Sequence, residues 1–96
     1  MTKDNEQNFE LLSSLLLKIR NKQEALNFLQ DIFSNKELGT LALRVQIAKM
    51  LHEGLSYIEI EKATGASSAT IAKVNEALKY GRDGLRTVLE RIKRTK

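Results

Sequence analysis

Apolar residues recur every three or four positions along nearly the whole chain, and no proline interrupts them. This spacing places apolar side chains on one face of an α-helix, whereas a strand would alternate apolar and polar residues. Without proline, every backbone amide can donate a hydrogen bond within a helix. The 96 residues suit one domain. The sequence therefore predicts an all-α fold of six helices in a single domain, residues 1–96.

Small polar residues and glycines mark the ends of these helices. Serine or asparagine caps a helix N-terminus, a glutamate three residues later can complete a capping box, and glycine commonly follows the last residue of a helix. The expected N-caps are Asn21, Ser34, Ser56 and Ser67, and the expected terminating glycines are Gly54, Gly65 and Gly81. The predicted helices span about residues 5–20, 22–33, 35–53, 57–63, 68–80 and 83–94.

The first two predicted helices have wide apolar faces, in residues 11–19 and 25–33. The second face is broader than one neighbouring helix can cover, and a chain of this length has only a modest core of its own. We therefore expect a second subunit to cover these faces, with residues 1–54 serving mainly in dimerisation.

The segment Leu55–Tyr80, LSYIEIEKATGASSATIAKVNEALKY, predicts a short helix, a sharp turn at Gly65 and a longer helix. This layout is typical of a helix-turn-helix, whose second helix enters the major groove of DNA by its N-terminal end. We assign residues 55–81 to this motif. The residues expected to face inward and hold its helices together are Ile58, Ile60, Ala63, Ile71, Val74 and Leu78.

The outward side of the second helix carries short side chains and a lysine. Hydroxyls can bond phosphates or base edges, methyl groups can meet thymine methyls, and the helix N-terminus suits a phosphate. The residues are Ser67, Ser68, Ala69, Thr70 and Lys73, and they predict binding to double-stranded DNA. The alternative is a plain helical hairpin whose serines only cap the helix and contact solvent.

The positive charge of the chain is concentrated in its last third. Residues 66–96 hold eight Lys and Arg against three Asp and Glu, whereas residues 1–65 hold eight against nine. A basic surface attracts polyanions such as DNA, and a solubilising tail is the alternative. The predicted basic helix in residues 82–96 contributes Arg82, Arg86, Arg91, Lys93 and Arg94.

The chain resembles the tryptophan repressor superfamily, specifically its repressor-related group in low-GC Gram-positive bacteria. The matching residues run from Leu41 to Gly81, LALRVQIAKMLHEGLSYIEIEKATGASSATIAKVNEALKYG, with IFSNKEL before them and GLRTVLERI after them. The resemblance implies an intertwined homodimer that regulates transcription, with repression as the expected outcome. The predicted DNA-binding residues are those that match DNA-contacting positions of the family, together with Ser56, the N-cap of the first helix of the motif. They are Ser56, Tyr57, Ile58, Ala66, Ser67, Ser68, Ala69, Thr70, Ala72 and Lys73.

The resemblance also implies a possible effector pocket. In the family, tryptophan lies between two arginines, near a glycine and a serine of the reading helix, which is the second helix of the helix-turn-helix. Arg44 matches one arginine, whereas Lys73 replaces the other and lacks its planar fork. Val74 replaces the glycine and should crowd an indole, Ala77 replaces the serine and cannot bond an ammonium group, and Ser34 matches a position in the pocket wall. We expect that tryptophan does not bind with useful affinity.

Several classes of function lack the residues that they need. There is no cysteine, and His52, the only histidine, has no partners at metal-ligand spacing and is expected near a helix dipole. The sequence contains no recognisable pair of nucleophile and base, so we do not expect an enzyme. We expect no metal or cofactor. The polar N-terminus and the absence of a long apolar stretch favour a cytoplasmic protein without a membrane partner, associated with the nucleoid when bound to DNA.

A helical dimerisation or adaptor module that has lost DNA binding is the alternative function. Tyr57, Ile58 and Glu61 motivate it, because the family has polar or basic residues at these positions. Tyr57 is expected either to touch DNA or to pack at the start of its helix. We expect Tyr80 to pack under the last helix.

Overall fold

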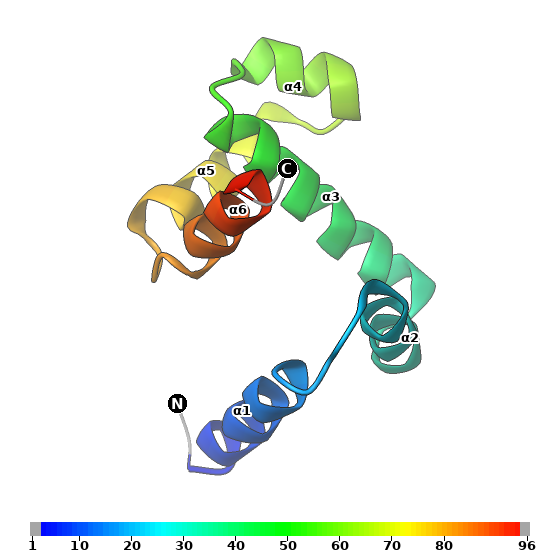
Figure 1. Ribbon diagram of the computed structural model, residues 1–96. Coiled ribbons are helices and arrows are strands. Elements are labelled where there is room, and N and C mark those ends of the chain that lie inside the picture. The colour runs from blue at the N-terminus through cyan, green and yellow to red at the C-terminus, as the bar shows by residue number, and fades with distance from the viewer. Residues whose placement is uncertain (1–2, 95–96) are drawn as a thin grey trace. The chain divides into compact units, whose positions relative to one another are not determined.

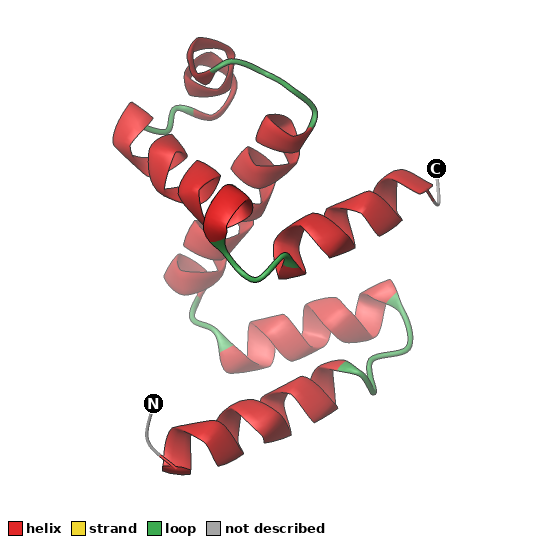
Figure 2. Ribbon diagram, turned by 90° about the vertical axis from the view of Figure 1, so that its left-hand side faces the viewer, coloured by secondary structure: helices red, strands yellow, loops and turns green. Residues whose placement is uncertain are grey.

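The computed structural model describes residues 3–94 and confirms the all-α fold with six helices (Figure 1). The helices are α1 Lys3–Leu16, α2 Lys22–Ile32, α3 Asn35–His52, α4 Tyr57–Thr64, α5 Ser68–Tyr80 and α6 Gly84–Arg94. No strand occurs within residues 3–94 (Figure 2). The side chains of the predicted basic residues Lys93 and Arg94 lie outside the described part of the chain.

Side-chain caps fix the starts of α2 and α3 as the sequence predicts. Ser34 Oγ accepts a hydrogen bond from the Glu37 amide at 3.1 Å, and Glu37 Oε1 accepts one from the Ser34 amide at 2.9 Å. Hydrogen bonding to Ser34 lowers the pKa of Glu37 below its ordinary value. The backbone amide of Ser34 has the larger effect and its hydroxyl the smaller one. Asn21 Oδ1 caps α2 in the same way, 2.9 Å from the Glu24 amide.

The first helix ends at Leu16, about four residues earlier than its apolar spacing predicts. Beyond this point the amides of Lys18 and Ile19 bond carbonyls three residues back, which closes a tight turn instead of continuing the helix. Asn21 is extended, with φ of −153° and ψ of 174°, as an N-cap residue must be. The cap of α2 therefore requires the chain to leave the helical conformation before Asn21.

The chain divides into two compact units, residues 1–38 and residues 39–96. In the N-terminal unit, neither α1 nor α2 contains a buried residue. The apolar side chains of Leu12 and Leu15 on α1 are 39% and 44% exposed. The apolar stripe that helical spacing predicts is thus present on α1 as an exposed surface.

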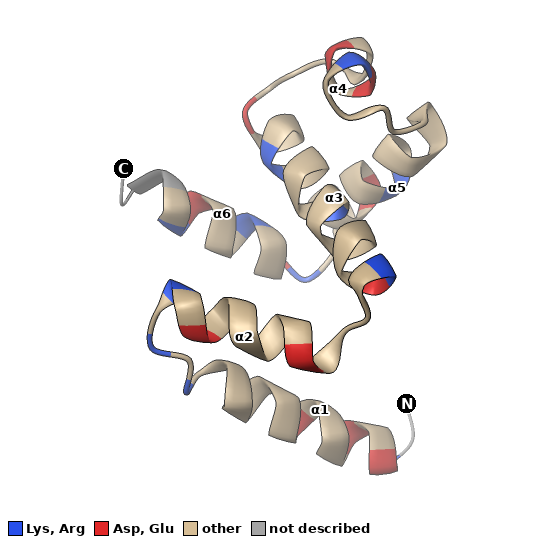
Figure 3. Cartoon of the chain, turned by 90° about the vertical axis from the view of Figure 1, so that its right-hand side faces the viewer, with Lys and Arg blue, Asp and Glu red and all other residues tan. Residues whose placement is uncertain are grey.

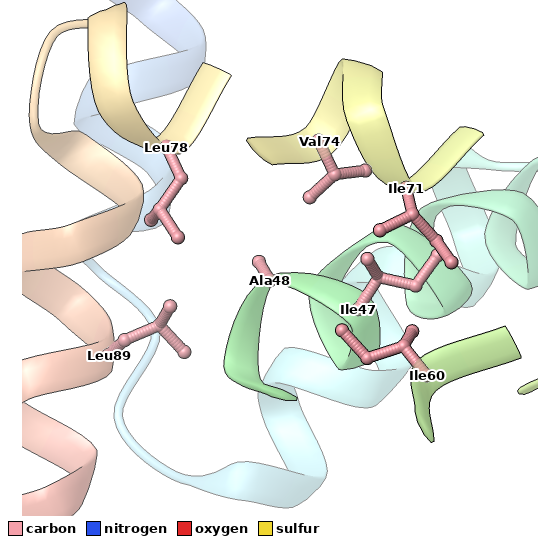
Figure 4. Packing of buried hydrophobic residues seen from close by; sticks show 7 residues of the cluster. All are labelled: Ile47, Ala48, Ile60, Ile71, Val74, Leu78 and Leu89. Atoms are coloured by element: carbon pink, nitrogen blue, oxygen red, sulfur yellow. The ribbon is translucent and has the colours of Figure 1, made fainter. Parts of the chain in front are cut away.

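Seven apolar residues form the buried core of the C-terminal unit (Figure 4). They are Ile47, Ala48, Ile60, Ile71, Val74, Leu78 and Leu89. The three isoleucines are completely buried, and they come from α3, α4 and α5 respectively. Each large apolar side chain buried in this way contributes about 1.5–3 kcal/mol. The cluster therefore holds the predicted helix-turn-helix against the C-terminal part of α3.

Two polar contacts attach α6 within the same unit. His52 Nε2 of α3 lies 2.6 Å from Glu90 Oε1 of α6. Arg86 Nη2 donates a hydrogen bond to the carbonyl oxygen of Leu78 at 2.9 Å. The sequence places His52 near a helix C-terminus but does not indicate its partner, because Glu90 belongs to a different helix.

Candidate nucleic-acid interface

Local hydrogen bonds build the α4–turn–α5 segment. At the start of α4, Ser56 Oγ accepts from the Glu59 amide at 3.2 Å, and Glu59 Oε2 accepts from the Ser56 amide at 2.7 Å. At its end, Gly65 has a φ of 76°, which is the left-handed conformation that glycine adopts without strain. Thr64 Oγ1 donates to a carbonyl one turn back at 2.7 Å and accepts from the Ala66 amide at 3.1 Å. These bonds define where α4 stops and how the chain turns.

Side-chain hydroxyls cap the start of α5. Ser67 Oγ accepts from the Thr70 amide at 3.2 Å and lies 3.1 Å from the Thr70 hydroxyl. The following residues Ser68 and Ala69 are exposed, and so is Lys73, the sixth residue of α5. The first part of α5 therefore presents short side chains, two hydroxyls and a cation from a helix that is anchored in the core.

The predicted contact residues on α5 and before it lie within residues 66–73, where the core residue Ile71 is not one of them. Ser67, Ser68, Ala69, Ala72 and Lys73 are exposed, and Ala66 and Thr70 are half-buried. The half-buried pair forms the base of this segment, because Ala66 packs against the core cluster and Thr70 lines a cleft beside it. The exposed residues of this segment are accessible to a ligand as large as duplex DNA.

The three predicted contact residues at the start of α4 differ from one another. Ser56 and Ile58 are exposed, whereas Tyr57 is half-buried and packs against the core cluster. Tyr57 Oη also accepts a hydrogen bond from Asn75 Nδ2 of α5 at 3.1 Å. Of the two roles that the sequence leaves open for Tyr57, packing at the start of the helix is thus present.

Three predictions about side-chain direction are wrong. Ile58 is 65% exposed and Ala63 is also exposed, although both were expected to face inward. Tyr80 is 81% exposed and does not pack under the last helix. Residues two positions apart on a helix point about 200° apart, so Ile58 and Tyr80 point outward because Ile60 and Leu78 point into the core. Ala63 lies in the last turn of α4. Helical spacing gives the side of the helix on which Ala63 lies, but it does not show whether this end of the helix reaches the core.

Lys and Arg residues recur along α5, the turn after it and α6 (Figure 3). Those with exposed side chains are Lys73, Lys79, Arg82, Arg86 and Arg91. Arg86 differs from the others, because it bonds the Leu78 carbonyl and its Nη1 lies 3.5 Å from Asp83 Oδ1. This predicted basic residue of the C-terminal helix therefore makes contacts within the fold, although its side chain is still exposed.

A cleft of about 470 Å³ lies between α3, α5 and α6. Small-molecule sites in proteins typically measure roughly 300–1,000 Å³. Four residues that the resemblance assigns to an effector pocket line this cleft, namely Arg44, Lys73, Val74 and Ala77, and its other lining residues are Leu41, Val45, Thr70 and Leu85. The fifth, Ser34, belongs to the N-terminal unit, where its hydroxyl caps α3.

Among the described residues, no group of His, Asp and Glu side chains is arranged to hold a metal ion. None of the helices in residues 3–94 combines the length and the apolar character needed to cross a bilayer. Every buried polar side-chain atom in this part of the chain has a hydrogen-bond partner.

The sequence matches the family model described as Trp repressor protein over residues 7–93. The protein YerC of Bacillus subtilis (strain 168), which is described as uncharacterized, is 39% identical over 84 residues. These residues are 88% of this chain and 81% of the relative.

Two solved structures are similar to this fold. The crystal structure of a TrpR-like protein from Eubacterium eligens ATCC 27750 has 41% sequence identity and a TM-score of 0.82, and the match covers 90% of this chain and 89% of the other. A Staphylococcus aureus structure described as that of a candidate Trp repressor has 30% identity and a TM-score of 0.84, with 97% and 96% covered.

Proposed function

Since the chain belongs to the Trp repressor family, we propose that it is a sequence-specific DNA-binding regulator of transcription, with repression as its expected action. The observation that carries this proposal is the set of exposed residues Ser67, Ser68, Ala69, Ala72 and Lys73, which joins short side chains and a lysine at the capped N-terminus of α5. Such a surface suits phosphates and base edges in a major groove. A bacterial regulator of this kind would act in the cytoplasm, at the nucleoid.

The DNA-binding surface in this proposal comprises Ser56, Ile58, Ala66, Ser67, Ser68, Ala69, Thr70, Ala72 and Lys73. Tyr57, which the resemblance also assigns to this surface, packs against the core cluster instead. Exposed Arg82 and Arg91 add positive charge in residues 82–94 of the same unit. Phosphate contacts give affinity and orientation, whereas the short side chains of α5 read base edges. No catalytic group is assigned, because the family is one of regulators rather than enzymes.

We further propose that two copies of the chain form a homodimer through residues 1–54. The exposed apolar residues of α1, which include Leu12 and Leu15, support this proposal, since a large exposed apolar surface marks an interaction site. A two-fold dimer presents its reading helices to symmetric half-sites about 34–36 Å apart. Residues 55–81 would then be the reading head of each copy.

An adaptor module without DNA binding is the second candidate function. Ile58 favours it, because this apolar side chain is 65% exposed at the start of α4, where a basic residue would pair with a phosphate. Glu61 adds negative charge to the same helix. In this case the exposed surface of α4 would bind protein, while the fold would stay the same.

Selection from a random-sequence pool of duplex DNA distinguishes the two functions. The wild-type protein is incubated with the pool at low salt, bound duplexes are recovered and amplified, and the products are sequenced after several rounds. The regulator is expected to enrich a sequence with two-fold symmetric half-sites. A pool that stays unenriched contradicts sequence-specific binding and favours the adaptor.

A further inference from the structure

One side-chain hydrogen bond connects the two helices of the reading head. Tyr57 is the first residue of α4, and its Oη accepts from Asn75 Nδ2 of α5 at 3.1 Å. Both side chains are half-buried. Among the described residues, no other hydrogen bond joins a side chain of α4 to a side chain of α5.

The distance of this bond from the turn allows it to restrict the orientation of α5 relative to α4. The two helices are joined at the turn around Gly65. Tyr57 lies eight residues before Gly65 and Asn75 seven residues after Ser68, so each partner is about 10–12 Å along its helix from the turn at 1.5 Å per residue. A link far from a pivot restricts the angle at that pivot more strongly than a link beside it.

Apolar packing and this hydrogen bond constrain the helix pair in different ways. Ile60, Ile71 and Val74 hold α4 and α5 together by burial, which is not directional. A hydrogen bond requires a defined distance and angle. Tyr57 supplies both kinds of constraint, because its ring packs against the core cluster while its hydroxyl bonds Asn75.

We propose that Tyr57 and Asn75 are positioning residues that set the orientation of the reading helix for its preferred DNA sequence. This inference rests on the proposed DNA-binding function. It gives Tyr57 a role that does not require a DNA contact, in place of the direct contact that the resemblance implies. A phenol hydroxyl can donate as well as accept, so the hydroxyl proton remains able to reach a phosphate, and the experiment must separate the two roles.

The test compares Tyr57→Phe, Asn75→Ala and the double variant with the wild type. Each protein is titrated against two fluorescent probes, a duplex enriched by the wild type from a random pool and the unselected pool itself, at several salt concentrations. Tyr80→Phe is the matched control, because it removes a hydroxyl from a tyrosine that is 81% exposed.

Each single variant is expected to bind the selected duplex about two- to tenfold more weakly, as the loss of one hydrogen bond allows. Binding to the unselected pool and the salt dependence should stay unchanged, so that the preference for the selected duplex falls. The double variant should lose no more than either single variant. Tyr80→Phe should behave as the wild type.

A loss in Tyr57→Phe alone, with a smaller salt dependence, would show a direct phosphate contact and overturn the positioning role. Additive losses, or no loss in either variant, would overturn it as well. Equal losses on both probes would indicate a general effect on folding and also count against it. If the wild type enriches no duplex from the pool at low salt, the proposed function itself fails, which is a separate result.

Discussion

Lys73 is the cation placed among the short side chains of α5, and its side chain is exposed. We predict that Lys73→Gln weakens binding to selected and random duplexes by similar factors, because a lysine that contacts phosphate carries little sequence information. The slope of log affinity against log salt concentration should become shallower by about one unit per protomer. Titration by fluorescence anisotropy measures both quantities.

A matched control separates this contact from a change in net charge. Lys22→Gln removes the same charge from the start of α2, in the N-terminal unit. We expect it to leave the salt dependence close to that of the wild type. Equal slopes for Lys73→Gln and the wild type would exclude Lys73 from the interface.

The cleft beside α5 is predicted to reject tryptophan. Arg44 and Lys73 can attract the carboxylate, but the cleft lining contains no carboxylate to receive the ammonium group, and its one hydroxyl, that of Thr70, lies 3.1 Å from Ser67 Oγ. Val74 is only 7% exposed and belongs to the core, so it cannot move aside for an indole. Isothermal titration calorimetry with millimolar tryptophan should give no binding heat. A clear heat with micromolar affinity would refute the prediction.

Residue-scale features could be predicted from the sequence where neighbours along the chain decide them. The caps at Ser34 and Ser56 are confirmed, because each depends on a glutamate three residues later. The directions of Ile58 and Tyr80 were predicted wrongly, because an apolar residue may occupy either side of an amphipathic helix. Their exposure depends on which face of each helix packs against the core, and tertiary contacts determine that face.

At the scale of elements, the turn between α4 and α5 depends on the left-handed conformation of Gly65. A Cβ added there would meet no atom within 4 Å, so the cost of Gly65→Ala is conformational and not steric. We predict a loss of about 1 kcal/mol in the free energy of unfolding. Urea denaturation followed by circular dichroism measures it.

Gly39→Ala is the matched substitution within α3. A Cβ at this position also meets no atom within 4 Å, and the residue lies in the helix. We expect it to raise the free energy of unfolding by roughly 0.5–1 kcal/mol, since alanine favours the helix. If both substitutions changed stability in the same direction, the account of the turn would be wrong.

The helices themselves could be predicted because spacing and caps are local, whereas their mutual contacts could not. The hydrogen bond between Tyr57 and Asn75 and the polar contact between His52 and Glu90 each join different helices. No spacing rule relates such residues, since the path of the chain between them determines their distance. The helix-turn-helix could thus be recognised in the sequence, but the contacts that orient it could not.

At the scale of the whole molecule, we predict that the protein is a homodimer in solution. Sedimentation equilibrium should give a mass close to twice the 10.9 kDa of one chain. Leu12→Glu with Leu15→Glu should shift it toward one chain, because charges on the apolar stripe of α1 oppose burial. Tyr80→Glu is the control, since Tyr80 is 81% exposed and lies outside residues 1–54. A monomeric wild type would contradict the prediction.

The central claim is that the exposed start of α5 binds the phosphates and bases of duplex DNA. Anisotropy titration of the wild-type protein with a labelled random duplex, over a series of salt concentrations, tests it most directly. Phosphate contacts release counterions, so log affinity should fall linearly with log salt concentration, with a slope of about −0.9 for each phosphate neutralised. No binding at low salt, or an affinity that does not change with salt, would contradict the account.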